Sequence, residues 1–189
     1  MPKRCPWAEK HELETEYHDT EWGVPEHNDQ KLFELLSLES AQSGLSWLTI
    51  LQKRDGYREA FVEFEIAKVA RYSAKKRAVL LKNPAIVRHK LKIDAVVENA
   101  KRILDIQQSQ GSFAAYVWDF VDGATVQNNW RTGAEVPSKT GVSDALSKDL
   151  KKRGFKFVGS TTCYSFMQAS GMVNDHLVSC FRYKAVQSE

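Results

Sequence analysis

Apolar residues recur at every third or fourth position through most of the chain, the spacing that gathers them on one face of an α-helix. The clearest case follows Asp29, a residue that can cap a helix, and has leucine or phenylalanine at positions 32, 33, 35, 36 and 38. Glycines that commonly end a helix close two other segments, at Gly154 and Gly171. Serine stands where an N-cap is expected before four segments, at Ser46, Ser73, Ser112 and Ser143, and the last of these is the segment that Gly154 closes.

Strand patterns are scarce by comparison. Little beyond the segment F-K-F-V at 155–158 predicts a β-strand. Residues 122–142 are rich in glycine, asparagine, threonine and proline, and they predict an irregular connection on the surface. No internal repeat interrupts this organisation. The pattern therefore predicts an all-α bundle.

One pair of helical segments, at about 74–104, flanks the dipeptide Asn83-Pro84, which predicts a tight turn. A helix-hairpin-helix of this kind can aim backbone N–H groups at a phosphate while lysine and arginine supply positive charge. Any hairpin of two helices would give a similar pattern. The segment alone therefore leaves DNA binding as one of two open interpretations.

Charge is distributed unevenly. The net charge is only +3, but residues 75–102 contain nine lysines and arginines against Asp94 and Glu98. A second basic run covers residues 148–156. Such runs are commonly solvated helix faces, yet the asymmetry favours a polyanionic partner over a neutral one.

Length and composition set wider bounds. The chain has 189 residues, 42% of them hydrophobic and 27% charged, as expected for a globular protein of one domain or two small lobes. We expect no membrane association, because no apolar run approaches the length of a membrane span. The three cysteines show no disulfide-framework spacing, which favours a reducing cytoplasm.

A possible metal site begins with His176 and Cys180, whose spacing of four places both side chains on one face of a helix. Cys163 lies in an apolar segment and is interpreted as a core residue, and His11, His27 and His89 lie in polar stretches and are expected to be solvated. That leaves two candidates near the N-terminus, Cys5 and His18. From spacing alone, a Cys₂His₂ zinc site and four unconnected buried side chains both remain open.

A carboxylate among aromatic residues suggests a binding pocket. Glu39 lies between apolar residues of a helix that should be mostly buried, and buried carboxylates are rare without a partner. One interpretation is that Glu39 is partly exposed or hydrogen-bonded to a helix cap. The other is that its carboxylate binds the polar edge of a flat ligand that stacks on aromatic rings. With a basic hairpin in the same chain, a nucleobase is the obvious flat ligand.

Four stretches together carry a resemblance to a known family: Y-H-D-T-E-W-G-V-P, K-L-F-E-L-L-S-L-E-S-A-Q-S-G-L-S-W-L-T-I-L, F-K-F-V-G-S-T-T-C-Y-S-F-M-Q-A-S-G-M-V-N-D-H and the central helix-hairpin-helix. Over essentially its whole length the chain resembles the DNA-3-methyladenine glycosylase I family. The resemblance implies a two-lobed, all-α fold of the helix-hairpin-helix glycosylase superfamily, forming a single domain over residues 1–189. It implies hydrolysis of the N-glycosidic bond of 3-methyladenine in alkylated double-stranded DNA, with water as the nucleophile, and release of the free base from an abasic site.

The resemblance also assigns residues to roles. It implies that Glu39 accepts hydrogen bonds from the flipped base. The implied base-binding residues are Tyr17, Trp22, Trp47, Trp7 and Ser165. The implied DNA contacts are Gln42, Gly44 and Leu45 at the gap left by the base, with Arg88, Lys90 and Lys92 in the basic hairpin. A structural zinc ion that joins the two chain ends in one lobe would be held by Cys5, His18, His176 and Cys180.

Three positions depart from the pattern of many relatives: Glu14 stands where tyrosine is common, and Ala85 and Leu91 stand where glycine is common. Alanine resists the positive φ that glycine accepts, so we expect the phosphate-binding geometry of the hairpin to differ from that of relatives. An alternative function is therefore a non-catalytic protein that binds damaged DNA. A zinc-dependent deaminase is disfavoured because the chain has no P-C-x-x-C motif. The resemblance implies a monomer with no obligate protein partner.

Overall fold

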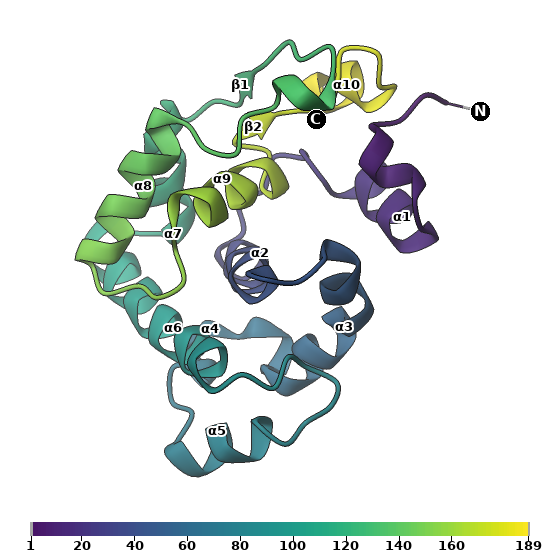
Figure 1. The fold of residues 1–189 in the computed structure, drawn as a ribbon. Coiled ribbons are helices and arrows are strands. Elements are labelled where there is room, and N and C mark those ends of the chain that lie inside the picture. The colour runs from purple at the N-terminus through teal and green to yellow at the C-terminus, as the bar shows by residue number, and fades with distance from the viewer. Residues whose placement is uncertain (1, 189) are drawn as a thin grey trace.

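The computed structural model describes residues 2–188 and is built mainly from α-helices (Figure 1). The helices are α1 (Glu12–Thr20), α2 (Asp29–Gln42), α3 (Trp47–Ala60), α4 (Ile66–Val69), α5 (Ala74–Leu80), α6 (Lys90–Gln110), α7 (Phe113–Trp118), α8 (Gly141–Lys152), α9 (Ser160–Ala169) and α10 (Arg182–Ala185). Short 3₁₀ turns lie at Pro6–Glu9, Val62–Phe64, Asp119–Val121, Gly133–Glu135 and Val186–Ser188. The predicted all-α class is confirmed. No described helix is long and apolar enough to cross a membrane.

Helix α2 lies at the centre of the molecule, surrounded by the other helices (Figure 1). It packs against α3, α6, α7 and α9, and every residue from Leu32 to Ala41 is buried. A helix enclosed on all sides must bury its polar residues together with its leucines. This enclosure is what carries Glu39 into the interior.

Most predicted helix starts are confirmed, and two are displaced. The hydroxyl groups of Ser46, Ser73 and Ser112 each accept a hydrogen bond from the backbone three residues later. Helix α8 begins earlier than predicted, because Thr140 is its cap and Ser143 completes the capping box.

The predicted cap Asp29 serves a different helix. Asn28 caps α2, and the Asp29 carboxylate instead accepts hydrogen bonds from the backbone N–H groups of Phe113 and Ala114, at 2.9 and 2.8 Å. These groups belong to the first turn of α7, whose N–H groups have no partner within the helix. Asp29 therefore fastens α7 to the start of α2.

The predicted strand at 155–158 is wrong. The segment is irregular, with Phe157 in the left-handed region at φ +56°. The buried Asn99 side chain binds both the carbonyl and the N–H of Lys156, at 3.0 and 2.8 Å, in place of a neighbouring strand. The described strands are instead β1 (Val126–Gln127) and β2 (Val173–Asn174), a two-residue parallel pair. β1 falls within the connection predicted to be irregular.

The basic hairpin consists of α5, a loop at 81–89 and the long α6. Ala85 is not among the residues with positive φ, so the substitution of glycine at this position causes no backbone strain. Its methyl group faces Gly56 of α3, where an added Cβ would stand 2.6 Å from the Ala85 Cβ and 2.4 Å from its carbonyl oxygen. The loop therefore packs directly onto α3 and is held in place by that contact. Leu91 lies on the surface and is 60% exposed.

Candidate active site and metal cluster

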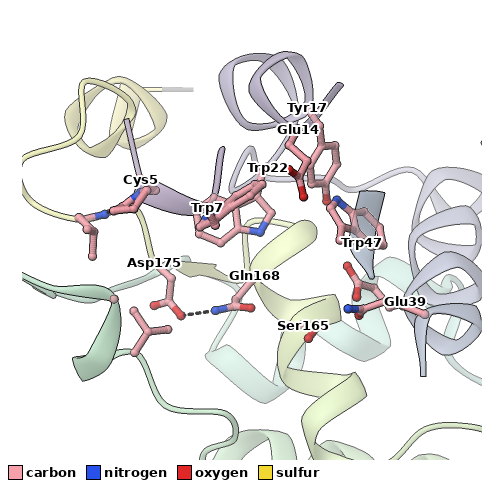
Figure 2. A pocket seen from close by; sticks show the side chains of 15 residues that line it. Cys5, Trp7, Glu14, Tyr17, Trp22, Glu39, Trp47, Ser165, Gln168 and Asp175 are labelled. Carbon is pink, nitrogen blue, oxygen red and sulfur yellow. Dashed lines mark hydrogen bonds between the residues drawn. The ribbon is translucent and has the colours of Figure 1, made fainter. Parts of the chain in front are cut away.

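A cavity of about 400 Å³ opens between α1, the start of α3 and α9. Figure 2 shows it from close by, with Tyr17 and Trp47 on one side and Ser165 and Gln168 on the other. The residues from the sequence analysis that line it are Trp7, Glu14, Tyr17, Trp22, Glu39, Gln42, Trp47 and Ser165, together with the candidate metal ligand Cys5. The remaining lining residues are Pro6, Gly133, Val136, Gln168, Asp175 and Leu177.

Aromatic rings form much of the wall. Trp7 and Trp22 meet edge to face with ring centroids 5.1 Å apart, and Tyr17 and Trp47 are tilted against each other at 5.2 Å. Beneath Tyr17 lies the guanidinium group of Arg54, 6.0 Å from the ring centroid. Because the rings brace one another, the cavity keeps flat apolar faces available to a ligand.

Glu39 is the most unusual group in the cavity. It is only 6% exposed, and its carboxylate makes no hydrogen bond or ion pair with any residue in 2–188. Burial alone raises the pKa of Glu39 to about 8. A buried carboxylate without a partner costs stability, which is the condition expected at a ligand-binding site.

Two further polar atoms share this condition. The hydroxyl of Tyr17 and the indole Nε1 of Trp47 are buried and have no hydrogen-bond partner in the described part of the chain. Burial raises the pKa of Tyr17 well above its ordinary value, with the nearby Glu39 charge as a smaller cause, so the hydroxyl stays protonated. The cavity therefore offers two donors and one carboxyl group to a flat ligand with polar edges.

Asp175 and Gln168 line the opposite wall, and sequence reasoning missed both. The Asp175 carboxylate accepts a hydrogen bond from Gln168 at 2.8 Å (Figure 2) and another from Tyr164 at 2.6 Å. It also accepts from Asn128 and Trp130, at 2.7 and 2.8 Å. Asp175 thus ties α9 to the loop after β1. The N-D-H sequence at 174–176 was the available signal, since it places a carboxylate next to a candidate ligand.

The metal-site candidates come together in space. Cys5, His18, His176 and Cys180 are all buried, and their ligand atoms lie within 4.8 Å of one another. The two nitrogens, His18 Nε2 and His176 Nδ1, are 3.2 Å apart. The sulfur-to-nitrogen distances that join them to Cys5 and Cys180 are 3.4 to 3.9 Å. A tetrahedral zinc ion with ordinary bond lengths separates its ligand atoms by roughly 3.3 to 3.8 Å.

The ring nitrogens that face away from the cluster are also fixed. His18 Nδ1 lies 2.8 Å from the Asp19 carboxylate, which the Arg4 guanidinium holds with hydrogen bonds of 2.7 to 3.0 Å. His176 Nε2 lies 2.9 Å from the Trp22 carbonyl oxygen, an atom that can only accept. Each histidine can therefore donate outward and leave its other ring nitrogen facing the cluster, the usual arrangement around a bound metal.

One cysteine of the cluster is favoured as a thiolate. The hydrogen bond between the two thiols lowers the pKa of Cys180, which favours the thiolate that a metal binds, and raises the pKa of Cys5. Close packing leaves the histidine little freedom, since a Cβ added at Gly23 would stand 3.0 Å from His176 Nε2. The residues set aside by the sequence analysis lie elsewhere: Cys163 is buried in the core, and His11, His27 and His89 are exposed.

The residues expected to contact DNA fall into two groups. Gln42 reaches the cavity, Gly44 adopts φ +79°, and Leu45 is 39% exposed on the loop between α2 and α3. In the basic hairpin, Arg88 is exposed without a partner in residues 2–188, and Lys90 pairs with Asp94.

Lys92 differs from the other two hairpin cations. Its ammonium group donates to the carbonyl oxygens of Ala41 and Ser43, at 2.7 and 2.6 Å. These carbonyls lie at the C-terminal end of α2, where they have no partner within the helix. Lys92 therefore supports the loop that carries Gly44 and Leu45.

Comparisons with known proteins agree with this geometry. The pattern of the methyladenine glycosylase family matches residues 7–183. The DNA-3-methyladenine glycosylase of Haemophilus influenzae is 47% identical over 180 residues, covering 95% of this chain and 97% of the relative. DNA-3-methyladenine glycosylase 1 of Escherichia coli is 48% identical over 181 residues, with coverage of 96% and 97%.

Solved structures agree equally well. A crystal structure of 3-methyladenine DNA glycosylase I superposes with a TM-score of 0.92 at 49% identity, covering 95% of this chain and 98% of the other. A variant of 3-methyladenine DNA glycosylase I in complex with 3-methyladenine superposes with a TM-score of 0.92 at 39% identity, with coverage of 94% and 96%.

Proposed function

The chain belongs to the methyladenine glycosylase family of DNA glycosylases, and from this premise we propose how its residues perform the reaction. The base of a 3-methyladenine nucleotide leaves the DNA stack and enters the cavity beside α2. There it lies against the faces of Trp7 and Trp22, while Glu39, the Tyr17 hydroxyl and the Trp47 indole N–H bind its polar edges. The observation that carries this proposal is that these three buried polar groups have no partner within residues 2–188.

The chemistry demands little acid catalysis. Methylation at N3 places a positive charge on the purine, which weakens its bond to the sugar and makes it a good leaving group. Water adds to the sugar carbon, the glycosidic bond breaks with its electron pair leaving on the base, and one proton passes to solvent. The products are free 3-methyladenine and an abasic site. The enzyme contributes by holding the extruded cation against aromatic faces, each cation–π contact being worth about 0.5–2 kcal/mol.

The reaction is proposed to stop at the abasic site. A lyase step requires a lysine amine that forms a Schiff base with the sugar. No lysine is among the residues that line the cavity in the described chain. Ser165, half-buried on α9, is assigned a place near the sugar.

The DNA surface is proposed to combine the hairpin with the loop after α2. Gln42, Gly44 and Leu45 approach the gap left by the extruded nucleotide. Arg88 contacts a phosphate, because its guanidinium is exposed and uncommitted. Lys90 adds charge beside it, and Lys92 acts through the loop that it supports.

Cys5, His18, His176 and Cys180 are proposed to hold one structural zinc ion. The donor set, the distances of 3.2 to 3.9 Å and the outward partners of both histidines fit such an ion. Four protein ligands leave no open position, so zinc here would supply no catalytic water. It would clasp the two ends of the chain beside Trp22, whose ring lines the cavity.

The deciding experiment is release of 3-methyladenine from methylated DNA by the purified protein. The Glu39→Gln variant keeps the shape of the cavity and removes its carboxylate, so we expect release to fall about 100-fold. Folding of the variant is checked by its melting temperature. Background release by the wild-type protein, with Glu39→Gln binding the free base equally well, would instead support the non-catalytic damage-binding protein.

The protein is proposed to act as a monomer on double-stranded DNA with no obligate protein partner. Its place would be the cytoplasm, where bacterial DNA is found and cysteines stay reduced. Cys5, Cys163 and Cys180 form no disulfide in the structure.

A further inference from the structure

The cavity is lined by carboxylates and by no opposing charge. Glu14, Glu39 and Asp175 line it, and no lysine, arginine or histidine among residues 2–188 does so. The chain as a whole carries a net charge of +3, so the sign of the cavity runs against the sign of the protein. An acidic lining between aromatic rings favours a cationic ligand.

Two of these carboxylates present little free charge. Asp175 is committed to four donors, from Asn128, Trp130, Tyr164 and Gln168. Burial raises the pKa of Glu39 to about 8, so this group is largely protonated at neutral pH until a ligand stabilises its charge.

Glu14 differs from both. It is only half-buried, and it forms no hydrogen bond or ion pair within the described residues. It lies in the first turn of α1, where the helix dipole stabilises negative charge. Its position three residues before Tyr17 places both side chains on one face of that helix. In Figure 2 the carboxylate points from α1 toward the cavity, across from Ser165.

We propose that Glu14 is a specificity-determining residue, whose free carboxylate favours a positively charged N3-alkylated purine over a neutral purine of the same shape. The proposal rests on the proposed function and divides the work of recognition. Glu39 takes up the polar edge of the base, and Glu14 supplies the charge that a neutral purine cannot use. An interaction between two charges across a partly solvated cavity corresponds to about tenfold in affinity.

The test compares two ligands that differ in charge. One is 3,9-dimethyladeninium, a fixed cation with a methyl group where the sugar would be, and the other is neutral 3-methyladenine. Binding is followed by calorimetry and by quenching of tryptophan fluorescence. Glu14→Gln should weaken binding of the cation about tenfold and change binding of the neutral base by less than about twofold. Glu16→Gln, an exposed glutamate on the same helix, should change neither.

Each other outcome has a defined meaning. Equal weakening of both ligands would overturn the proposal, because Glu14 would then contribute shape and not charge. An unchanged affinity for the cation would overturn it as well, provided that the melting temperature of the variant matches the wild type. Base release from methylated DNA is measured alongside. If the wild type releases the base and Glu14→Gln keeps the wild-type preference for the cation over the neutral base, the proposed role of Glu14 is refuted while the proposed function stands. Absence of both release and binding in the wild type refutes the proposed function.

Discussion

The cluster of Cys5, His18, His176 and Cys180 adjoins the aromatic cavity, yet buried polar groups have partners around the cluster and lack them in the cavity. In the cluster, both outward-facing histidine nitrogens have partners, and the neighbouring Asp175 accepts four hydrogen bonds. In the cavity, the Glu39 carboxylate, the Tyr17 hydroxyl and the Trp47 indole have none within residues 2–188. Trp22 belongs to both regions, since its carbonyl binds His176 while its ring lines the cavity.

The difference separates groups that hold the fold from groups that await a ligand. A buried polar group with a partner is near neutral or favourable for stability, whereas one without a partner costs about 1–3 kcal/mol. Substitutions in the cluster should therefore destabilise the protein, and a substitution that neutralises Glu39 should stabilise it. Four measurements test this contrast, from the largest expected effect to the smallest.

The largest effect is expected from loss of a cluster ligand. Cys180→Ala should lower the free energy of unfolding by about 5 kcal/mol or more, because metal binding energy is folding energy in a site of this kind. The measurement is denaturant unfolding of zinc-loaded protein, with the metal content determined by elemental analysis. Cys163→Ala is the matched control, a buried cysteine outside the cluster that should cost only about 1 kcal/mol. Equal losses in the two variants, with no effect of a chelator on the wild type, would contradict the metal site.

Glu39 should make the unfolding free energy of the protein depend on pH. Burial raises the pKa of Glu39 from 4.5 to about 8, so below about pH 4.5 the group is protonated in both the folded and the unfolded state and its ionisation costs no stability. As pH rises toward 8, the unfolded chain ionises and the folded protein does not, so stability is lost. At about 1.4 kcal/mol per pKa unit, the loss approaches about 4 kcal/mol.

The measurement is the difference in unfolding free energy between Glu39→Gln and the wild type from pH 4.5 to 8.5. The variant has no titrating group here, so the difference should grow in its favour as pH rises. Taking a difference cancels the titration of the proposed metal ligands, which both proteins share. Glu16→Gln, an exposed glutamate, should give a flat difference. A flat profile for Glu39→Gln would show that the carboxyl group is not desolvated.

Asp175 should behave as a member of the partnered region although it lines the cavity. Asp175→Asn keeps the shape but cannot accept from all four donors, so we expect a loss of about 3 kcal/mol in unfolding free energy. Asp119→Asn, at an exposed position, is the control and should change stability by less than about 0.5 kcal/mol. A small loss for Asp175→Asn would mean that its hydrogen bonds are exchanged with water.

The helices could be predicted from the sequence because their evidence is local. The serine caps at Ser46, Ser73 and Ser112 need only the residues that follow them, and all three are confirmed. Asp29 shows the limit of local reading: its carboxylate caps α7, which begins 84 residues later. The strand predicted at 155–158 failed for a similar reason, because the buried Asn99 satisfies that backbone from another helix.

The candidate site shows the same difference between residues that local sequence indicates and residues that only the tertiary fold brings in. Spacing indicated His176 and Cys180, and elimination left Cys5 and His18 as candidates from the other end of the chain. The resemblance to a family was needed to join the four into one site. The aromatic and carboxylate side of the cavity lies in two short motifs, so the sequence could indicate it. Gln168 and Asp175 come from segments that reach the cavity only through the tertiary fold. The N-D-H sequence places Asp175 beside a candidate ligand without indicating that it lines the cavity, and no local pattern marks Gln168.

The smallest effect is expected at the proposed DNA surface, where a cation with partners can be compared with one without. Lys92 is a partnered cation, bound to the carbonyls of Ala41 and Ser43, whereas Arg88 is exposed and unpartnered. Arg88→Met should weaken duplex binding and reduce the slope of log affinity against log salt by about one, because one phosphate contact is lost. Lys92→Met should weaken binding by about fivefold through a loosened loop, with a much smaller change in slope. Fluorescence anisotropy on one duplex across a range of salt concentrations measures both quantities. If Arg88→Met and Lys92→Met reduced the salt slope equally, Lys92 would also contact a phosphate. The difference between partnered and unpartnered groups would then not hold at the hairpin.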